Sequence, residues 1–138
     1  MRTLRCLSTL AITLLLAGCA VLQPGAPPEP SQNAAVVALF AQARAQSSAE
    51  QTEAAGASLE RALRIEPRNP VLWQELARVR LAQGQYRQAE NLAAKANALA
   101  GDDQRLRAEN WRIIGQARSE RGDQAGAQSA FERAEGKR

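Results

Sequence analysis

Residues 70–103 read PVLWQELARVRLAQGQYRQAENLAAKANALAGDD, and this stretch decides the fold of the chain. Trp73 and Leu76 begin a helical pattern, Gly84 interrupts it, and a second helical pattern starts at Tyr86. Small and apolar residues recur at helical spacing in both halves, and glycine permits the left-handed backbone that ends a helix. The stretch therefore predicts two helices joined by a tight turn.

The segment from Trp111 onward repeats this pattern. Trp111 precedes Gly122 by 11 residues, the same interval that separates Trp73 from Gly84. The alanines of the second helices also keep their intervals, with Ala89 and Ala96 in one segment matched by Ala127 and Ala134 in the other. Because self-similarity at a fixed period is the signature of repeat architectures, we expect a stack of helical hairpins.

The residues before this stretch form a weaker copy of the unit. Its second helix is clear over residues 55–65, where apolar residues recur at helical spacing. Counting back in register places Leu39 at the tryptophan position and Gln42 where leucine is expected. The pair Asn69-Pro70 then predicts a helix start, because it offers a capping side chain followed by proline in the first turn.

The third copy is longer than the second. The two tryptophans are 38 residues apart instead of 34, and the extra residues lie within 102–108. Four residues are close to one helical turn of about 3.6, so an added turn on the first helix would keep its apolar face in phase. Asp102 and Asp103 are both candidates for the residue that caps this helix.

This pattern resembles the tetratricopeptide repeat, which has W-x2-L-G-x2-Y, a helix-breaking glycine, A-x3-F and a closing proline. The resemblance covers about residues 36–135 and implies an all-α fold, a short α-solenoid of three helical hairpins with about six helices. We place the repeats at about 36–69, 70–103 and 108–138, in a domain of residues 33–138. Four positions depart from the family pattern, and we expect looser packing in the central unit as a result. Arg80 and Arg118 replace tyrosine, Ala93 replaces the aromatic residue, and Gly101 replaces proline.

The N-terminus has the features of a secretory signal. Arg2 and Arg5 precede an apolar run over residues 7–17, which is shorter than the ~20 residues of a membrane-spanning helix. The sequence Leu-Ala-Gly that precedes Cys19 resembles the lipobox of bacterial lipoproteins. The resemblance implies that residues 1–18 are a signal peptide and that Cys19 becomes the lipidated first residue, with fatty acids such as palmitate. An ordinary signal with an incidental cysteine is the alternative.

The residues after Cys19 predict a tether and a location. Residues 19–32 contain four of the six prolines of the chain, which favours a semi-extended spacer, with a proline-rich ligand as the alternative. An aspartate after the lipidated cysteine commonly retains Gram-negative lipoproteins in the inner membrane. The chain has Ala20 there, so in a host with two membranes we expect an outer-membrane anchor facing the periplasm.

The composition argues against catalysis. The chain has no histidine, which is the common general base and metal ligand. By the resemblance to lipoproteins, Cys6 would leave with the signal and Cys19 would carry the lipid, so no thiol nucleophile would remain. No phosphate-binding glycine loop is present. We therefore expect no enzyme, no cofactor other than the covalent lipid, no metal site and no small-molecule substrate.

The charge of the chain argues against nucleic acid as a partner. The formal net charge is +4, and loss of the two signal arginines reduces 18 basic residues to 16, against 14 acidic ones. Nucleic-acid binding requires a concentrated basic stripe, which this balance does not favour.

A protein or peptide partner remains, and the resemblance implies where it binds. Tetratricopeptide arrays typically hold a peptide in the concave face formed by the first helix of each repeat. Arginines on this face would favour an acidic ligand or a C-terminal carboxylate; alternatively, they are solvated or pair with Glu75 and Glu109. The residues that the register assigns to this groove are Phe40, Arg44, Gln74, Arg78, Arg112 and Gln116.

Some members of the family hold chaperone C-termini with a clamp of lysines and asparagines. The corresponding residues here are Phe40, Arg44, Glu75, Glu109 and Ile113. Since Arg44 alone is basic, the sequence does not support that ligand.

Three functions stay open. The first is a membrane-anchored adaptor that binds a peptide or partner protein in the periplasm. The second is a pilotin-like assembly factor for a secretin or pilus system, and the third is a binder of an anionic envelope polymer. The C-terminal edge also leaves two interpretations: Gln128, Glu132 and Glu135 give it a polar finish, or the last hairpin offers an apolar edge to a partner.

Overall fold

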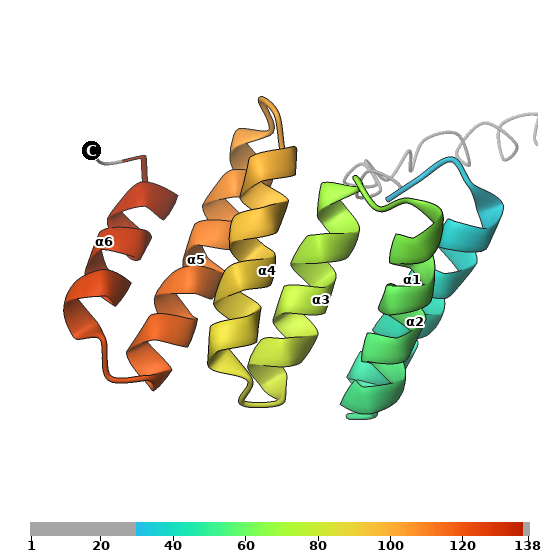
Figure 1. Ribbon diagram of the computed structural model, residues 1–138, viewed down its shortest axis with the longest axis horizontal. Coiled ribbons are helices and arrows are strands. Elements are labelled where there is room, and N and C mark those ends of the chain that lie inside the picture. The colour runs from blue at the N-terminus through green and yellow to red at the C-terminus, as the bar shows by residue number, and fades with distance from the viewer. Residues whose placement is uncertain (1–29, 137–138) are drawn as a thin grey trace, which may run out of the picture.

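The computed structural model describes residues 30–136, which form three antiparallel helical hairpins (Figure 1). The predicted signal peptide, Cys19 and most of the predicted tether lie outside the described residues. Within them no helix is both long and apolar enough to cross a membrane. Unit 1 contains α1 (Ala34–Ser48) and α2 (Thr52–Ile65), unit 2 contains α3 (Pro70–Ala82) and α4 (Tyr86–Leu99), and unit 3 contains α5 (Gln104–Glu120) and α6 (Gln124–Ala134).

The starts of α3 and α5 are capped as the sequence indicated. The side chain of Asn69 accepts hydrogen bonds from the backbone amides of Val71 and Leu72, and Pro70 occupies the first turn of α3. Asp103 caps α5 by accepting from the amide of Leu106. Helix α5 has 17 residues against 13 for α3, which confirms the added turn. Unit 3 therefore begins four residues before the boundary at 108 that we predicted.

The turns inside units 2 and 3 depend on glycine. Gly84 and Gly122 have φ angles of 71° and 83°, a left-handed conformation that other residues adopt at a cost. In both turns the chain reverses within a few residues, so the two helices of each hairpin pack side by side (Figure 1). The predicted role of these glycines is confirmed.

Two apolar clusters hold the stack together. The first joins α1, α2 and α3 through branched and aromatic side chains, among them Phe40, Leu59 and Leu72. The second joins units 2 and 3 and contains the alanines Ala77, Ala93 and Ala130 beside two isoleucines. The core thus changes from large side chains in the first part of the chain to small ones in the second.

The close approach of the two helices differs between units 2 and 3. In unit 3 the ring of Phe131 lies on Gly115, where an added Cβ would come within 2.5 Å of a ring carbon. In unit 2 the corresponding positions hold Ala77 and Ala93, both fully buried. An alanine pair therefore replaces the phenylalanine–glycine pair, which is how unit 2 accommodates its missing aromatic residue.

Candidate partner-binding groove

The first helices of the three units line one groove of about 810 Å³. Helices α1, α3 and α5 each contribute side chains, and Pro30 closes one margin. Four of the six residues that the register assigned to a binding face are among those that line it, namely Phe40, Arg44, Gln74 and Arg78.

One part of the groove is apolar. Val37, Phe40 and Ala41 of α1 face Val71 of α3 across it. The guanidinium carbon of Arg44 lies 6.0 Å from the centre of the Phe40 ring, so this cation borders the apolar part. Within the described residues Arg44 forms no ion pair. This part of the groove suits an apolar side chain with a negative charge beside it.

The other part of the groove is charged and internally paired. Arg78 lies 2.8 Å from a carboxylate oxygen of Glu109 and 3.7 Å from one of Glu75. Arg105 lies 3.4 Å from the second oxygen of Glu109. The charge of Arg78 is therefore matched by two carboxylates, that of Glu75 on its own helix and that of Glu109 on α5. This is the pairing that we gave as the alternative.

Glu75 has an unusual environment for a carboxylate. Burial raises the pKa of Glu75, and the neighbouring Glu109 adds to this shift, while the guanidinium groups of Arg78 and Arg44 oppose it. The group thus carries its negative charge at a cost in desolvation. A partner cation is not needed to balance it, since Arg78 lies in contact.

Gln74 has a structural contact that the sequence did not reveal. Its amide nitrogen donates to Oδ1 of Asn110 at 3.0 Å and to the carbonyl oxygen of Leu106 at 3.4 Å. Both amide side chains are buried, with 4% of Gln74 and 0% of Asn110 exposed. The pair links α3 to α5 beneath the groove. The sequence contains a sign that Asn110 is buried, because this polar residue lies four positions after Leu106 and three before Ile113, on the apolar face of the helix.

Arg112 and Gln116 lie elsewhere. Both are exposed, and neither is among the residues that line the groove. The extra turn of α5 explains the difference, since residues near its N-terminus, Arg105 and Glu109, contribute to the groove instead. Register counted from the tryptophans therefore placed the α5 contribution too far along the helix.

Pro30 and Ser31, at the end of the predicted tether, are held beside the groove. Asn69 donates from its amide nitrogen to the carbonyl oxygen of Pro30 at 2.6 Å and to Glu66 at 2.7 Å. The hydroxyl of Ser31 donates to the other carboxylate oxygen of Glu66. Glu66 accepts one hydrogen bond from Ser31 and one from Asn69, and these two bonds, the one from Ser31 first, lower the pKa of Glu66. The chain thus enters the domain at the turn between units 1 and 2.

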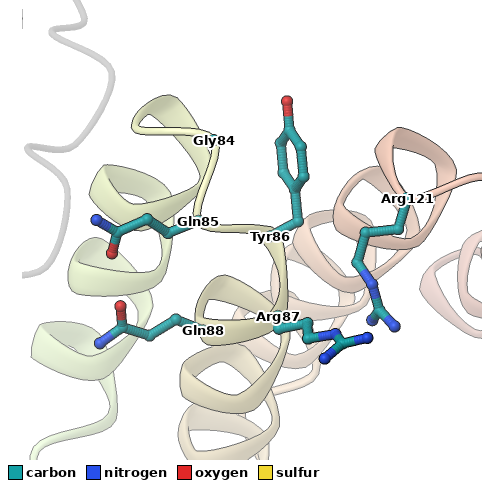
Figure 2. Close-up of a pocket in the computed structure, with 6 residues that line it drawn as sticks. All are labelled: Gly84, Gln85, Tyr86, Arg87, Gln88 and Arg121. Atoms are coloured by element: carbon teal, nitrogen blue, oxygen red, sulfur yellow. The ribbon is translucent and has the colours of Figure 1, made fainter.

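A second hollow lies at the turn between α3 and α4 (Figure 2). Gln85 and Gln88 point to one side, Tyr86 rises beside the turn at Gly84, and Arg87 extends toward Arg121 (Figure 2). Arg121 is bound to Glu90 at 2.9 Å. The described residues contain no group of three or more metal-ligating side chains, here or elsewhere.

The helical hairpins, the capped starts of α3 and α5, and the groove along the first helices define the class of protein. The chain belongs to the tetratricopeptide repeat family, whose pattern matches residues 47–108. Domains of this family are typically non-catalytic modules for protein interaction. Comparison with curated protein sequences gave no match.

Three solved structures are similar to this chain. The globular C-terminal domain of P. aeruginosa LpoP is 41% identical with a TM-score of 0.74, and the match covers 76% of this chain and 99% of that one. The TPR domain of Sgt2 from Aspergillus fumigatus is 26% identical, with a TM-score of 0.67 and coverage of 80% and 73%. The N-terminal domain of stress-induced protein-1 from C. elegans is 20% identical, with a TM-score of 0.67 and coverage of 74% and 85%, and shows the fold alone.

Proposed function

We propose that this protein is a non-enzymatic adaptor of the bacterial envelope, anchored to the outer membrane through a lipid on Cys19. In this proposal the domain faces the periplasm and holds a segment of a partner protein along α1, α3 and α5. The observation that carries the proposal is the groove itself, because all three units contribute their first helices to it.

The two parts of the groove define the expected partner segment. An apolar side chain would pack among Val37, Phe40 and Val71, where apolar area can be buried. A carboxylate next to it would reach Arg44, which borders that part. The paired charges of Arg78 and Glu109 would orient the partner segment in the groove more than they would raise its binding affinity. The best ligand is therefore a short segment with an apolar anchor followed by an acidic residue.

The paired charges also weigh against an anionic polymer as ligand. A polyanion gains affinity from each cation that it neutralises, and Arg78 and Arg105 are already bound to Glu109. The alternative role in assembly of a secretin or pilus system remains compatible with the same groove.

Site-specific photo-crosslinking in cells tests the groove. The probe replaces Ala41, which is exposed and lines the apolar part. A probe at Gln88, which is exposed near the other hollow, is the matched control. We expect one discrete protein adduct from position 41 and none from position 88. Equal adducts at both positions, or none at 41, would contradict the proposal.

The anchor needs a separate test. Cys19→Ser removes the thiol that would carry the lipid, so the protein should move from the membrane fraction to the soluble periplasmic fraction. Cys6→Ser, in the same signal region, is the control and should leave the protein with the membranes. An unchanged membrane fraction for Cys19→Ser would refute lipid anchoring without bearing on the groove.

A further inference from the structure

Units 2 and 3 share a feature in which a basic side chain covers a tryptophan. The amine of Lys95 on α4 lies 5.9 Å from the centre of the Trp73 ring, and the guanidinium carbon of Arg133 on α6 lies 4.7 Å from that of Trp111. Both distances fall in the range of cation–π attraction. Each hairpin therefore holds an indole on its first helix beneath a cation from its second helix. We call this arrangement the tryptophan slot.

Unit 1 has the cation of this slot and lacks the indole. Counting back 34 residues from Trp73 and Lys95 gives Leu39 and Arg61. A hollow of about 520 Å³ surrounds them, lined by Ala38, Leu39 and Gln42 of α1 and by Arg61, Arg64 and Ile65 of α2. Ile65 is 44% exposed, which is unusual for a large aliphatic side chain in this protein. The smaller leucine thus leaves open a slot that the other units fill from within.

We propose that this hollow is a second docking site, which receives a tryptophan side chain of a partner protein from a segment with acidic neighbours. Arg61 covers the incoming indole as Lys95 and Arg133 cover their own. Leu39 and Ile65 supply the apolar floor, where an aromatic side chain buries a large area. The site lies on a different part of α1 from the groove, and it stands whether or not the groove binds a partner.

The charges around the hollow specify the flanking residues. Arg61 and Arg64 are both exposed, and in the part of the chain that the structure describes neither takes part in an ion pair. They lie three residues apart on α2, so they project from the same side of the helix. Carboxylates on either side of the tryptophan complement these two cations.

A second copy of the chain fits this end of the solenoid poorly. Unit 2 stacks on unit 1 through Leu72 and Leu76, which are 0% and 4% exposed. The same register positions in unit 1 are Ala38 and Gln42, which provide no apolar ridge for another hairpin. A single inserted side chain suits the hollow better than a stacked helix.

A peptide titration tests the site on the full chain. The probe is N-acetyl-Asp-Trp-Glu-amide, and the same peptide with alanine for tryptophan is its control. Nuclear magnetic resonance would follow the backbone amides of Leu39 and Arg61. We expect saturable shifts there with the tryptophan peptide, and binding at least about tenfold weaker with the alanine peptide, as for a buried aromatic anchor. Shifts confined to other surfaces, or equal binding of the two peptides, would overturn the proposal.

Two variants and a control sharpen the result. Leu39→Trp fills the slot from within, so it should raise the melting temperature and weaken peptide binding at least about tenfold. Arg61→Ala removes the covering cation on an exposed surface and should weaken binding several-fold without loss of helix content. Lys95→Ala alters the filled slot of unit 2 and should leave binding unchanged. Peptide affinity equal to that of the wild type in both Leu39→Trp and Arg61→Ala would overturn the proposal. Concentration-dependent self-association of the protein that both variants abolish would also overturn it, because the hollow would then bind a second copy of the chain.

Discussion

The joint between units 1 and 2 and the joint between units 2 and 3 differ in chemistry. In the first joint, Leu72 and Leu76 of α3 pack among large apolar residues of α1 and α2. In the second, the isoleucines of α5 meet alanines, and the buried amides of Gln74 and Asn110 connect α3 to α5. The first joint therefore buries larger apolar side chains, and the second combines smaller apolar side chains with a buried amide pair.

The arginines in place of the family tyrosine form an ion pair across each joint, with partners at different register positions. Arg80 of α3 lies over Gly56, where an added Cβ would come within 3.1 Å of its guanidinium, and reaches Glu60 one turn further along α2. Arg118 of α5 pairs at 2.7 Å with Glu90, the residue of α4 that occupies the register position of Gly56. A glycine in one unit and a glutamate in the next thus direct the same arginine to different partners.

The difference shows that a solenoid can keep its repeat geometry while each joint is stabilised by its own interactions. Apolar burial tolerates small changes of register, whereas an ion pair or a buried amide pair requires specific atoms to meet. We expect perturbations of the two joints to differ in size and in their response to salt and pH.

The largest effect should come from the apolar joint. Leu72→Ala removes a side chain that is fully buried, and we expect it to lower the free energy of unfolding by about 2–5 kcal/mol. Urea denaturation followed by circular dichroism measures the change. Leu99→Ala, at a partly buried leucine, is the matched control and should lose less than half as much. Equal losses of unfolding free energy in the two variants would mean that the first joint contributes no more to stability than the site of Leu99.

The next effect concerns the buried amide pair. Asn110→Ala removes the closer partner of the buried Gln74 amide and leaves it only the 3.4 Å contact with the Leu106 carbonyl, which should cost about 1–3 kcal/mol. Replacing both residues, with Gln74→Met and Asn110→Leu, should restore most of this loss because no polar group is then left unpaired. The same denaturation experiment measures both. A double variant as unstable as the single one would show that the joint needs these amides for another reason.

A smaller effect separates the two arginine contacts. Glu90→Gln weakens contacts with Arg118 and Arg121, whose distances are 2.7 and 2.9 Å, and should cost about 1 kcal/mol. Glu60→Gln should cost less, because 46% of the Glu60 side chain is exposed against 19% for Glu90. Thermal unfolding at low and high salt compares them. The difference between the two stability losses should become smaller in high salt. A larger loss for Glu60→Gln than for Glu90→Gln would contradict this prediction.

The smallest effect concerns the pH dependence of the groove. Because burial raises the pKa of Glu75, the folded state holds this proton more strongly than the unfolded state. Folding therefore gains stability as pH falls through the raised pKa, and carries a cost above it. Glu75→Gln should increase the free energy of unfolding slightly at pH 7, and the increase should disappear near pH 4. A variant less stable than the wild type at pH 7 would show that the contact with Arg78 outweighs desolvation.

The sequence predicted the candidate groove in part. Helical register placed Phe40, Arg44 and Arg78 on one face, where they are among the residues that line the groove, because residues of one helix face recur at a fixed spacing. It misplaced the contribution of α5, where one added turn changed which residues reach the groove. It also missed the amide pair of Gln74 and Asn110, since these residues are 36 positions apart and no local pattern connects them.

Local sequence was sufficient for the hairpins of this protein. The cap at Asn69, the glycine at Gly84 and the spacing of the apolar residues act within one or two turns of helix, so the pattern of neighbours specifies them. The choice of partners for Arg78, Arg80 and Arg118 required the tertiary structure. Each lies near carboxylates or amides of other helices, and the packing of the units decides which of them comes within bonding distance. The open slot at Leu39 likewise depends on the tertiary structure, because it is the space that Trp73 and Trp111 fill in the other two units.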